Sequence, residues 1–184
     1  MISPDPVALA ELLNSKIRDV PDYPKPGVLF KDIAPLLADA EAFAALTKAL
    51  AERAQALGAT KVVGLEARGF VLAAPAAFAA GLGFVPIRKA GKLPGAVHAQ
   101  SYDLEYGSAT VEVQCDAFAP GERVLLVDDV LATGGTLAAS LDLVKRAGAE
   151  LAGVVVLMEL AFLPGRERLL PHLGDAPLET LISI

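Results

Sequence analysis

The sequence predicts an α/β fold in which helices cover both faces of a mainly parallel sheet, a doubly wound arrangement, and three features support it. Four short apolar runs recur along the chain, at 61–65, 84–87, 124–127 and 152–158. Runs of this kind are typical of strands buried on both faces. A loop follows each run, and segments with helical spacing follow several of them. Together these features place a ligand site beyond the carboxyl ends of the strands.

Length and composition favour one compact domain over residues 1–184. Hydrophobic residues make up 54% of the chain and charged residues 21%, which disfavours disordered and fibrous classes of protein. The formal net charge of −6 argues against a nucleic-acid-binding protein, since such proteins usually carry a basic face. Any polyanionic ligand is therefore expected to meet local positive charge.

The sequence indicates a cytoplasmic protein that does not enter a membrane. The single cysteine, Cys115, has no partner for an internal disulfide, and the first residues lack the basic and then apolar layout of a secretion signal. Residues 69–87 carry no charge, a length that raises the question of a membrane span. Glycines and prolines divide this stretch instead into a helix over 71–80, a turn and the strand over 84–87.

The N-terminal part is expected to hold two helices and a rigid loop. Apolar residues recur at helical spacing over 5–18, where Pro6 suits a first helical turn. Prolines within 22–27 exclude a helix there and predict a loop. A second helix is expected over 40–57, ending at Gly58.

The later segments predict a flap and two C-terminal elements. Residues 101–106 and 110–114 alternate enough to form a hairpin around Gly107, which is expected to project beyond the main sheet. Near the C-terminus, residues 163–170 suggest a short helix and 178–184 an edge strand.

The stretch from Val124 to Thr136 carries most of the expected chemistry. Asp128 and Asp129 stand near the end of its strand, and a glycine-rich turn then opens a helix that runs to about residue 147. Such a turn offers backbone N–H groups, the positive end of the helix dipole and threonine hydroxyls to a phosphate, and the paired carboxylates can accept hydrogen bonds from ribose hydroxyls. The expected phosphate-binding residues are Ala132, Thr133, Gly134, Gly135 and Thr136.

This stretch is similar to the phosphoribosyl-diphosphate (PRPP) motif of type I phosphoribosyltransferases. The resemblance covers nearly the whole chain and is closest to the adenine phosphoribosyltransferase family. The other segments that carry it are 23–33, 64–70, 87–95, 101–107 and 158–160. It implies Mg²⁺-dependent transfer of the phosphoribosyl group of PRPP to adenine, giving AMP and pyrophosphate in purine salvage, by a homodimer. It also implies a base-binding hood over 1–35 and a basic loop with a flexible flap over 88–114.

The resemblance assigns pyrophosphate binding to two loops. The first is Glu66-Ala67-Arg68-Gly69, where type I enzymes often have a cis peptide matching the bond between Glu66 and Ala67, and where Arg68 would donate hydrogen bonds to the pyrophosphate. A cation at a helix start opposes the helix dipole and so calls for an anion. The second is the basic loop, whose Arg88, Lys89 and Lys92 would contact the diphosphate, with Lys92 reaching the neighbouring subunit's site.

The resemblance places the base between Phe30 and Leu160, while backbone groups of Leu29 and Lys31 read the exocyclic amine edge. Relatives that use 6-oxopurines recognise the oxygen with a lysine after the PRPP helix, and this chain has no lysine after Lys145. That favours a 6-aminopurine. Lys31 stands where the family often has arginine, and Glu66-Ala67 where some members have Asp-Ser, which leaves the finer substrate affinity open.

The resemblance assigns catalysis to Arg68 and to Glu105, which would exchange a proton with the purine. Tyr106 lies beside it on the flap, and flap closure would exclude water. Positive charge that develops on the ribose would be opposed by Asp128 and Asp129. No residue is assigned as a direct metal ligand, because Mg²⁺ is expected to be held mainly by PRPP and water near these carboxylates.

Two alternatives stay open. One is the same transfer to another base, such as xanthine or a pyrimidine. The other is a non-catalytic PRPP-sensing regulator, which would need a DNA-binding module and a basic face; the first thirty residues are short and rich in proline, and the chain is acidic. His98, His172 and Cys115 lack metal-ligand spacing.

Overall fold

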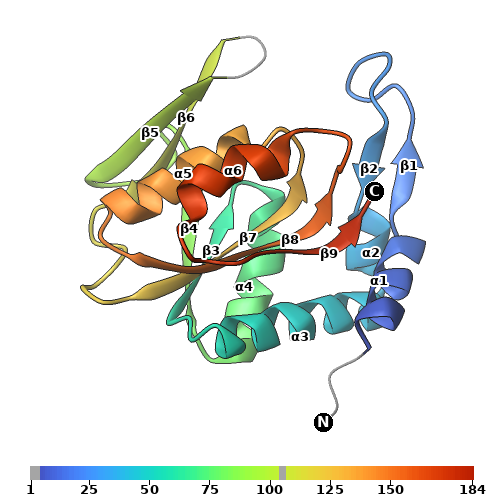
Figure 1. Ribbon diagram of the computed structural model, residues 1–184, viewed down its shortest axis with the longest axis horizontal. Coiled ribbons are helices and arrows are strands. Elements are labelled where there is room, and N and C mark those ends of the chain that lie inside the picture. The colour runs from blue at the N-terminus through green and yellow to red at the C-terminus, as the bar shows by residue number, and fades with distance from the viewer. Residues whose placement is uncertain (1–4, 104–106) are drawn as a thin grey trace. The chain divides into compact units, whose positions relative to one another are not determined.

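A computed structural model describes residues 5–103 and 107–184 (Figure 1). Backbone packing divides the chain into two compact units, residues 1–49 and 50–184. Helix α3 (Ala40–Ala56) begins in the first unit and ends in the second. The expected residues Glu105 and Tyr106 lie outside the described residues.

The first unit combines short helices with a small two-stranded sheet. Helix α1 (Pro6–Ser15) begins after Asp5, whose side chain accepts a hydrogen bond from the backbone of Val7 at 3.1 Å. The prediction that this helix reaches residue 18 was wrong, because β1 (Arg18–Val20) pairs antiparallel with β2 (Phe30–Asp32). Helix α2 (Ala34–Ala38) follows and was not predicted.

The second unit is built on a seven-stranded sheet in the order β5-β6-β4-β3-β7-β8-β9. All four predicted apolar runs lie in its parallel part, although most of the strands extend beyond the runs. The parallel strands are β3 (Lys61–Leu65), β4 (Gly83–Lys89), β7 (Arg123–Leu131), β8 (Glu150–Glu159) and β9 (Leu178–Ser183).

Strand β8 spans Glu150–Glu159, and its carboxyl end lies beside that of β7, with Leu131 in register with Glu159. The hairpin of β5 (Val97–Asp103) and β6 (Ser108–Gln114) joins the edge of β4 in antiparallel register, through the pairs Arg88↔Glu112 and Lys89↔Val111. As predicted, the rest of the hairpin projects beyond the sheet (Figure 1). Its first strand starts at Val97, four residues before the predicted start at Ser101.

Helices cover both faces of this sheet (Figure 1). Helix α4 (Arg68–Ala80) lies against one face, and α5 (Gly135–Arg146) and α6 (Gly165–Leu173) lie together against the other. The core beneath α5 and α6 is formed by apolar side chains of the sheet and of both helices. This arrangement confirms the doubly wound α/β prediction. Within the described residues, no helix combines the length and apolar character that a bilayer crossing requires.

Candidate active site

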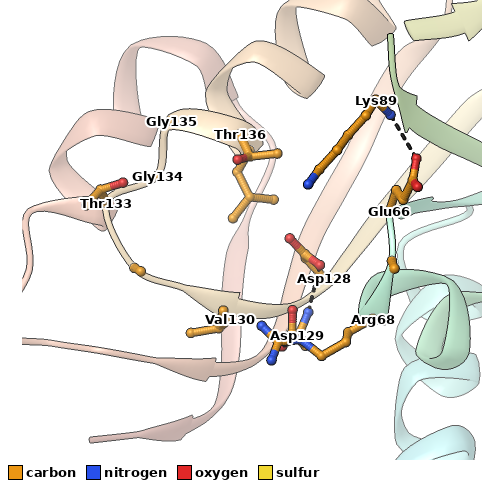
Figure 2. Close-up of a pocket in the computed structure, with 13 residues that line it drawn as sticks. Glu66, Arg68, Lys89, Asp128, Asp129, Val130, Thr133, Gly134, Gly135 and Thr136 are labelled. Carbon is orange, nitrogen blue, oxygen red and sulfur yellow. Dashed lines mark hydrogen bonds and ion pairs between the residues drawn. The ribbon is translucent and has the colours of Figure 1, made fainter. Parts of the chain in front are cut away.

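A pocket of about 380 Å³ opens at the carboxyl ends of β3, β4 and β7 (Figure 2). It is lined by three segments that are far apart in the sequence, and most of the expected site residues lie on them. Val130 and Leu137 also line the pocket and were not predicted. The expected residues that the structure brings together here are Glu66, Ala67, Arg68, Lys89, Asp128, Asp129, Ala132, Thr133, Gly134, Gly135 and Thr136.

The glycine-rich turn after β7 is held in shape by close backbone packing. Gly134 precedes α5 in a left-handed conformation, with φ of 76°, which glycine adopts without strain. A Cβ atom at Gly134 would lie 2.8 Å from the backbone oxygen of Gly165, and one at Gly165 would lie 2.1 Å from that of Ala132. The turn and the start of α6 therefore approach each other in a way that only glycine permits.

Gly165 was not predicted to contribute to the site. An ion pair fixes α6, the helix that begins at Gly165. Arg166 donates to both carboxylate oxygens of Glu159 at the end of β8, through Nε at 2.8 Å and Nη2 at 2.6 Å. The Arg166 hydrogen bonds hold the pKa of Glu159 below its ordinary value despite its burial. This two-pronged contact anchors α6 beside the turn. The only local signal was a glycine after Pro164 at a predicted helix start.

The two aspartates at the end of β7 have different surroundings. Asp128 points into the pocket, whereas Asp129 is turned toward Arg68 (Figure 2). Asp129 Oδ2 lies 2.7 Å from Arg68 Nε, and the Asp129 backbone N–H donates to Asp128 Oδ1 at 3.0 Å. Strand alternation explains this difference, because β7 continues through both residues.

Burial shifts the titration of both aspartates. Burial raises the pKa of Asp128 well above its ordinary value, and the charge of Asp129 raises it further. Burial also raises the pKa of Asp129, while the Arg68 guanidinium acts in the opposite direction. A Cβ at Gly69 would lie 2.8 Å from Asp128 Oδ1, so the start of α4 helps to confine this carboxylate. The pocket thus holds ionisable groups whose negative charge is poorly solvated.

Glu66 lies on the side of the pocket away from the glycine-rich turn (Figure 2), where basic-loop residues surround its carboxylate. Its carboxylate accepts a hydrogen bond from the Lys89 backbone N–H at 2.9 Å and lies 3.3 Å from Arg88 Nε and 3.4 Å from Lys92 Nζ. Burial opposes its charge, yet these three donors together keep the pKa of Glu66 below its ordinary value. The peptide bond between Glu66 and Ala67 is cis, as the resemblance implied.

The three basic-loop cations do not share one environment. Arg88 and Lys92 are paired with Glu66 and do not contribute to the pocket lining. The Lys89 side chain lines the pocket and extends toward Asp128 (Figure 2). It has no ion pair within residues 5–103 and 107–184. The three cations lie close together in the sequence and were therefore predicted to act together. The sequence does not reveal that Glu66 pairs with Arg88 and Lys92.

The expected base-contacting residues fall into both units. In the first unit, the Phe30 ring meets that of Tyr23 edge to face, with centroids 5.0 Å apart. Lys31 pairs through Nζ with Asp19 at 2.7 Å, and Leu29 is half exposed. In the second unit, the Leu160 backbone N–H donates to the Leu131 oxygen at 2.9 Å, just beyond the end of β8.

Comparison with known proteins identifies the family. A model of the phosphoribosyl transferase domain matches residues 35–168. An adenine phosphoribosyltransferase of Streptomyces coelicolor is 67% identical over 180 residues, which cover 98% of this chain and 99% of the relative. The chain belongs to the adenine phosphoribosyltransferase family.

Solved structures of adenine phosphoribosyltransferases agree with this assignment. The enzyme of Rhodothermus marinus is 48% identical, with a TM-score of 0.89 over 97% of this chain and 99% of that one. The enzyme of Saccharomyces cerevisiae, solved with D-2,5-dideoxy-2,5-imino-altritol 1,6-bisphosphate and adenine, is 39% identical, with a TM-score of 0.88 over 95% of this chain and 99% of that one. The family resemblance and the fold predicted from the sequence are thereby confirmed.

Proposed function

We propose that the protein is an adenine phosphoribosyltransferase that joins adenine to the phosphoribosyl group of PRPP and releases pyrophosphate, so that AMP is regained from free base. The observation that carries this proposal is the pocket at the strand ends, where a phosphate turn, a carboxylate pair and Arg68 line one space. The yeast family member was solved with a sugar-like bisphosphate and adenine, ligands that match two anion-binding ends and a base site.

The phosphate turn is suited to the 5′-phosphate of PRPP. Residues Ala132 to Thr136 carry no charged side chain, so binding depends on backbone N–H groups, the α5 dipole and the hydroxyls of Thr133 and Thr136. In this placement, Asp128 faces the ribose, and Asp129 becomes available to it once Arg68 pairs with the incoming anion. Ionised carboxylates accept hydrogen bonds from the ribose hydroxyls.

The leaving pyrophosphate is assigned to the Glu66–Arg68 segment and the basic loop. Lys89 has its ammonium group in the pocket. Arg68 Nε lies 2.7 Å from the buried Asp129 carboxylate, and an incoming anion can take the place of Asp129 as the partner of Arg68. As the bond to pyrophosphate breaks, negative charge grows on the leaving oxygen and these cations stabilise it. The carboxylates at the end of β7 oppose the positive charge that develops on the ribose.

Mg²⁺ is the metal that the family implies. The described residues contain no cluster of three or more acidic, histidine or cysteine side chains that could hold a metal ion. In this proposal the ion is held mainly by substrate oxygens and water. Asp128 and Asp129 are the carboxylates proposed to lie near the ion, because both line the pocket. The ion would neutralise diphosphate charge when bound.

Adenine is assigned to the segment around Phe30 and to Leu160, and Glu105 is assigned the proton exchange with the purine. We expect Glu105→Gln to lower turnover by roughly 100-fold while PRPP affinity changes little. Asp116→Asn, at an exposed acidic residue just after the second strand of the same hairpin, is the control. Unchanged turnover in the Glu105 variant would remove this assignment.

A homodimer is part of the proposal. Helix α4 exposes Val71 and Phe78, which are seven residues apart and so lie on one side of the helix. Light scattering of the purified protein measures the oligomeric state. If Lys92 serves the neighbouring site, mixing a Lys92→Ala chain with an Asp128→Asn chain restores activity, because one site of the hybrid dimer is then intact. Since Lys92 lies beside Glu66 of its own chain, absence of restoration would assign it to its own site.

The experiment that tests the function offers five bases separately to the protein with PRPP and Mg²⁺: adenine, hypoxanthine, guanine, xanthine and orotate. AMP formation from adenine alone is the expected result. Product from another base would keep the PRPP site and overturn the base assignment. PRPP binding without any product would favour a sensing role. The exposed free thiol of Cys115 agrees with a reducing cytoplasm as the site of this reaction.

A further inference from the structure

A hydroxyl pair connects the phosphate turn to the β5–β6 hairpin. Thr136 Oγ1 donates a hydrogen bond to the hydroxyl oxygen of Tyr102 over 3.0 Å. Thr136 lines the pocket at the start of α5, whereas Tyr102 lies on β5, 34 residues earlier, and does not contribute to the pocket lining. Tyr102 therefore contacts Thr136, a pocket residue, without lining the pocket itself.

The Tyr102 ring packs against the apolar core and against the start of α5. It is half-buried against the apolar core beneath α5. A Cβ at Gly135 would lie 3.4 Å from Tyr102 Cδ2, so the ring edge stands over the backbone of the first residue of α5. The phenol has little freedom to move away from Thr136.

A second contact fixes the strand that carries Tyr102. Gln100 precedes it by two positions and so shares its face of β5. The Gln100 side-chain oxygen accepts a hydrogen bond from Arg146 Nη1 at 3.3 Å, at the last residue of α5. Both ends of α5 are thus tied to one face of β5, which locates the Tyr102 hydroxyl relative to the phosphate turn.

The chemistry of two hydroxyl groups suits this location to phosphate binding. Each hydroxyl has one proton to donate and can also accept. A phosphate oxygen needs the Thr136 proton, and the Tyr102 O–H group can then donate to Thr136 Oγ1 in its place. Hydrogen bonds that run in one direction polarise and strengthen each other. The Tyr102 hydroxyl therefore supports the donor strength of Thr136 as well as its side-chain orientation.

We propose that Tyr102 is a positioning residue for the 5′-phosphate, acting through Thr136. The inference rests on the proposed function for the identity of the phosphate ligand, although it depends on neither the base nor the transfer step. It assigns to the hairpin a contribution to ground-state binding of the substrate, made by a residue outside the pocket.

The test compares Tyr102→Phe with the unchanged protein, using ribose 5-phosphate and pyrophosphate as separate probes in calorimetry. Loss of one hydrogen bond predicts a Kd for ribose 5-phosphate that is higher by roughly fivefold. The KM for PRPP is expected to rise by a similar factor while kcat stays the same. Pyrophosphate affinity is expected not to change, because Tyr102 does not touch that end of the pocket.

Two controls separate positioning from a general structural effect. Ser101→Ala removes another hydroxyl pair of the same hairpin, the 2.9 Å contact with Thr110, and is expected to leave both probes unaffected. In a Thr136→Val background, Tyr102→Phe should have no further effect, whereas in a Thr133→Val background its full effect should remain.

Equal losses for both probes, or a full Tyr102→Phe effect in the Thr136→Val background, would overturn the proposal. Failure of the proposed function has a different signature. In that case the unchanged protein would make no AMP, while the ribose 5-phosphate measurements would still decide the role of Tyr102.

Discussion

The two ends of the pocket that we propose to bind anions are built by different means. At the phosphate turn, Ala132 to Thr136 offer no charged side chain, and close glycine contacts with Gly165 define their shape. At the opposite end, Arg68, Arg88 and Lys92 are each paired with a carboxylate of the protein. One end depends on backbone fit, and the other combines Lys89, which has no ion pair among the described residues, with cations that would have to exchange ionic partners.

This difference separates two sources of selectivity. The proposed phosphate turn presents backbone N–H donors in a preformed arrangement. Of its side chains, Thr136 has to redirect its hydroxyl proton, and its hydrogen bond with Tyr102 then reverses direction. A diphosphate at the other end, as proposed, would compete with Glu66 and Asp129 for the cations, so its affinity would reflect the difference between two ionic environments. Steric changes should therefore act mainly on the first end and charge changes mainly on the second.

The largest effect is expected from Gly165→Ala, which places a Cβ 2.1 Å from the Ala132 oxygen. We expect the free energy of unfolding to fall by about 3 kcal/mol and the affinity for ribose 5-phosphate by roughly 100-fold, since the turn or α6 must shift. Thermal unfolding and calorimetry measure these changes. Gly83→Ala is the control, because its Cβ would make ordinary contacts of 3.5 Å or more with Lys61. Equal behaviour of the two variants would contradict the fit described for the turn.

The next effect is expected from Arg68→Met at the ionic end. Removal of the guanidinium takes away a donor to the leaving pyrophosphate and leaves Asp129 without its 2.7 Å partner, so we expect kcat to fall by roughly 100-fold. Ribose 5-phosphate affinity should change much less. Arg53→Met removes an ion pair with Glu179 of similar length, 2.9 Å, outside the pocket lining and serves as the control. A larger loss of ribose 5-phosphate binding than of kcat would reverse the division between the two ends.

A smaller effect concerns stability and pH. Because the pKa of Asp128 and that of Asp129 are raised in the folded protein, the folded state binds more protons than the unfolded state above the ordinary carboxyl range. The stability of the ligand-free protein should then decrease as pH rises from that range toward the raised values. Asp128→Asn removes a poorly solvated charge, so at neutral pH it should stabilise the empty protein by about 1 kcal/mol. Denaturant titrations across pH test this, and an unchanged slope in the variant would count against it.

The smallest effect is expected from Glu66→Gln. Loss of its charge frees Arg88 and Lys92, so pyrophosphate affinity should rise by roughly fivefold at neutral pH. The lowered pKa of Glu66 contributes stability above the ordinary carboxyl range, and this contribution is lost as pH falls through the lowered value. The variant should therefore show a weaker loss of stability in acid. Glu122→Gln, which removes a pair with Lys61 at 2.8 Å, controls for loss of an acid elsewhere; weaker pyrophosphate binding by the Glu66 variant would contradict partner exchange.

Much of the fold and of the site was predictable because the relevant signals are local in the sequence. The apolar run before Asp128, the paired carboxylates and the glycine-rich turn are contiguous, and the parallel-sheet topology then brings Glu66 to Arg68 to the same edge. The small β1–β2 sheet was missed because its strands are three residues long, too short for a period to emerge.

Other features depend on contacts between distant segments. The approach of Gly165 to Ala132 is set by the anchoring of α6 through Glu159 and Arg166, and no local pattern reports it. The choice of Glu66 as partner for Arg88 and Lys92 likewise arises from side-chain packing across adjacent loops. The sequence therefore predicted the charged residues at the basic-loop end of the pocket but not their ion pairs.

The carboxylate of Glu66 also has a consequence for the many small anions that surround the protein in a cell. A singly or doubly charged competitor gains little by approaching Arg88 and Lys92, because an internal anion already occupies them. A ligand with several closely spaced negative charges can offset the loss of that internal contact. The internal pairing should therefore make Arg88 and Lys92 selective for anions of high valence, whereas Lys89, which has no ion pair among the described residues, does not share this selectivity.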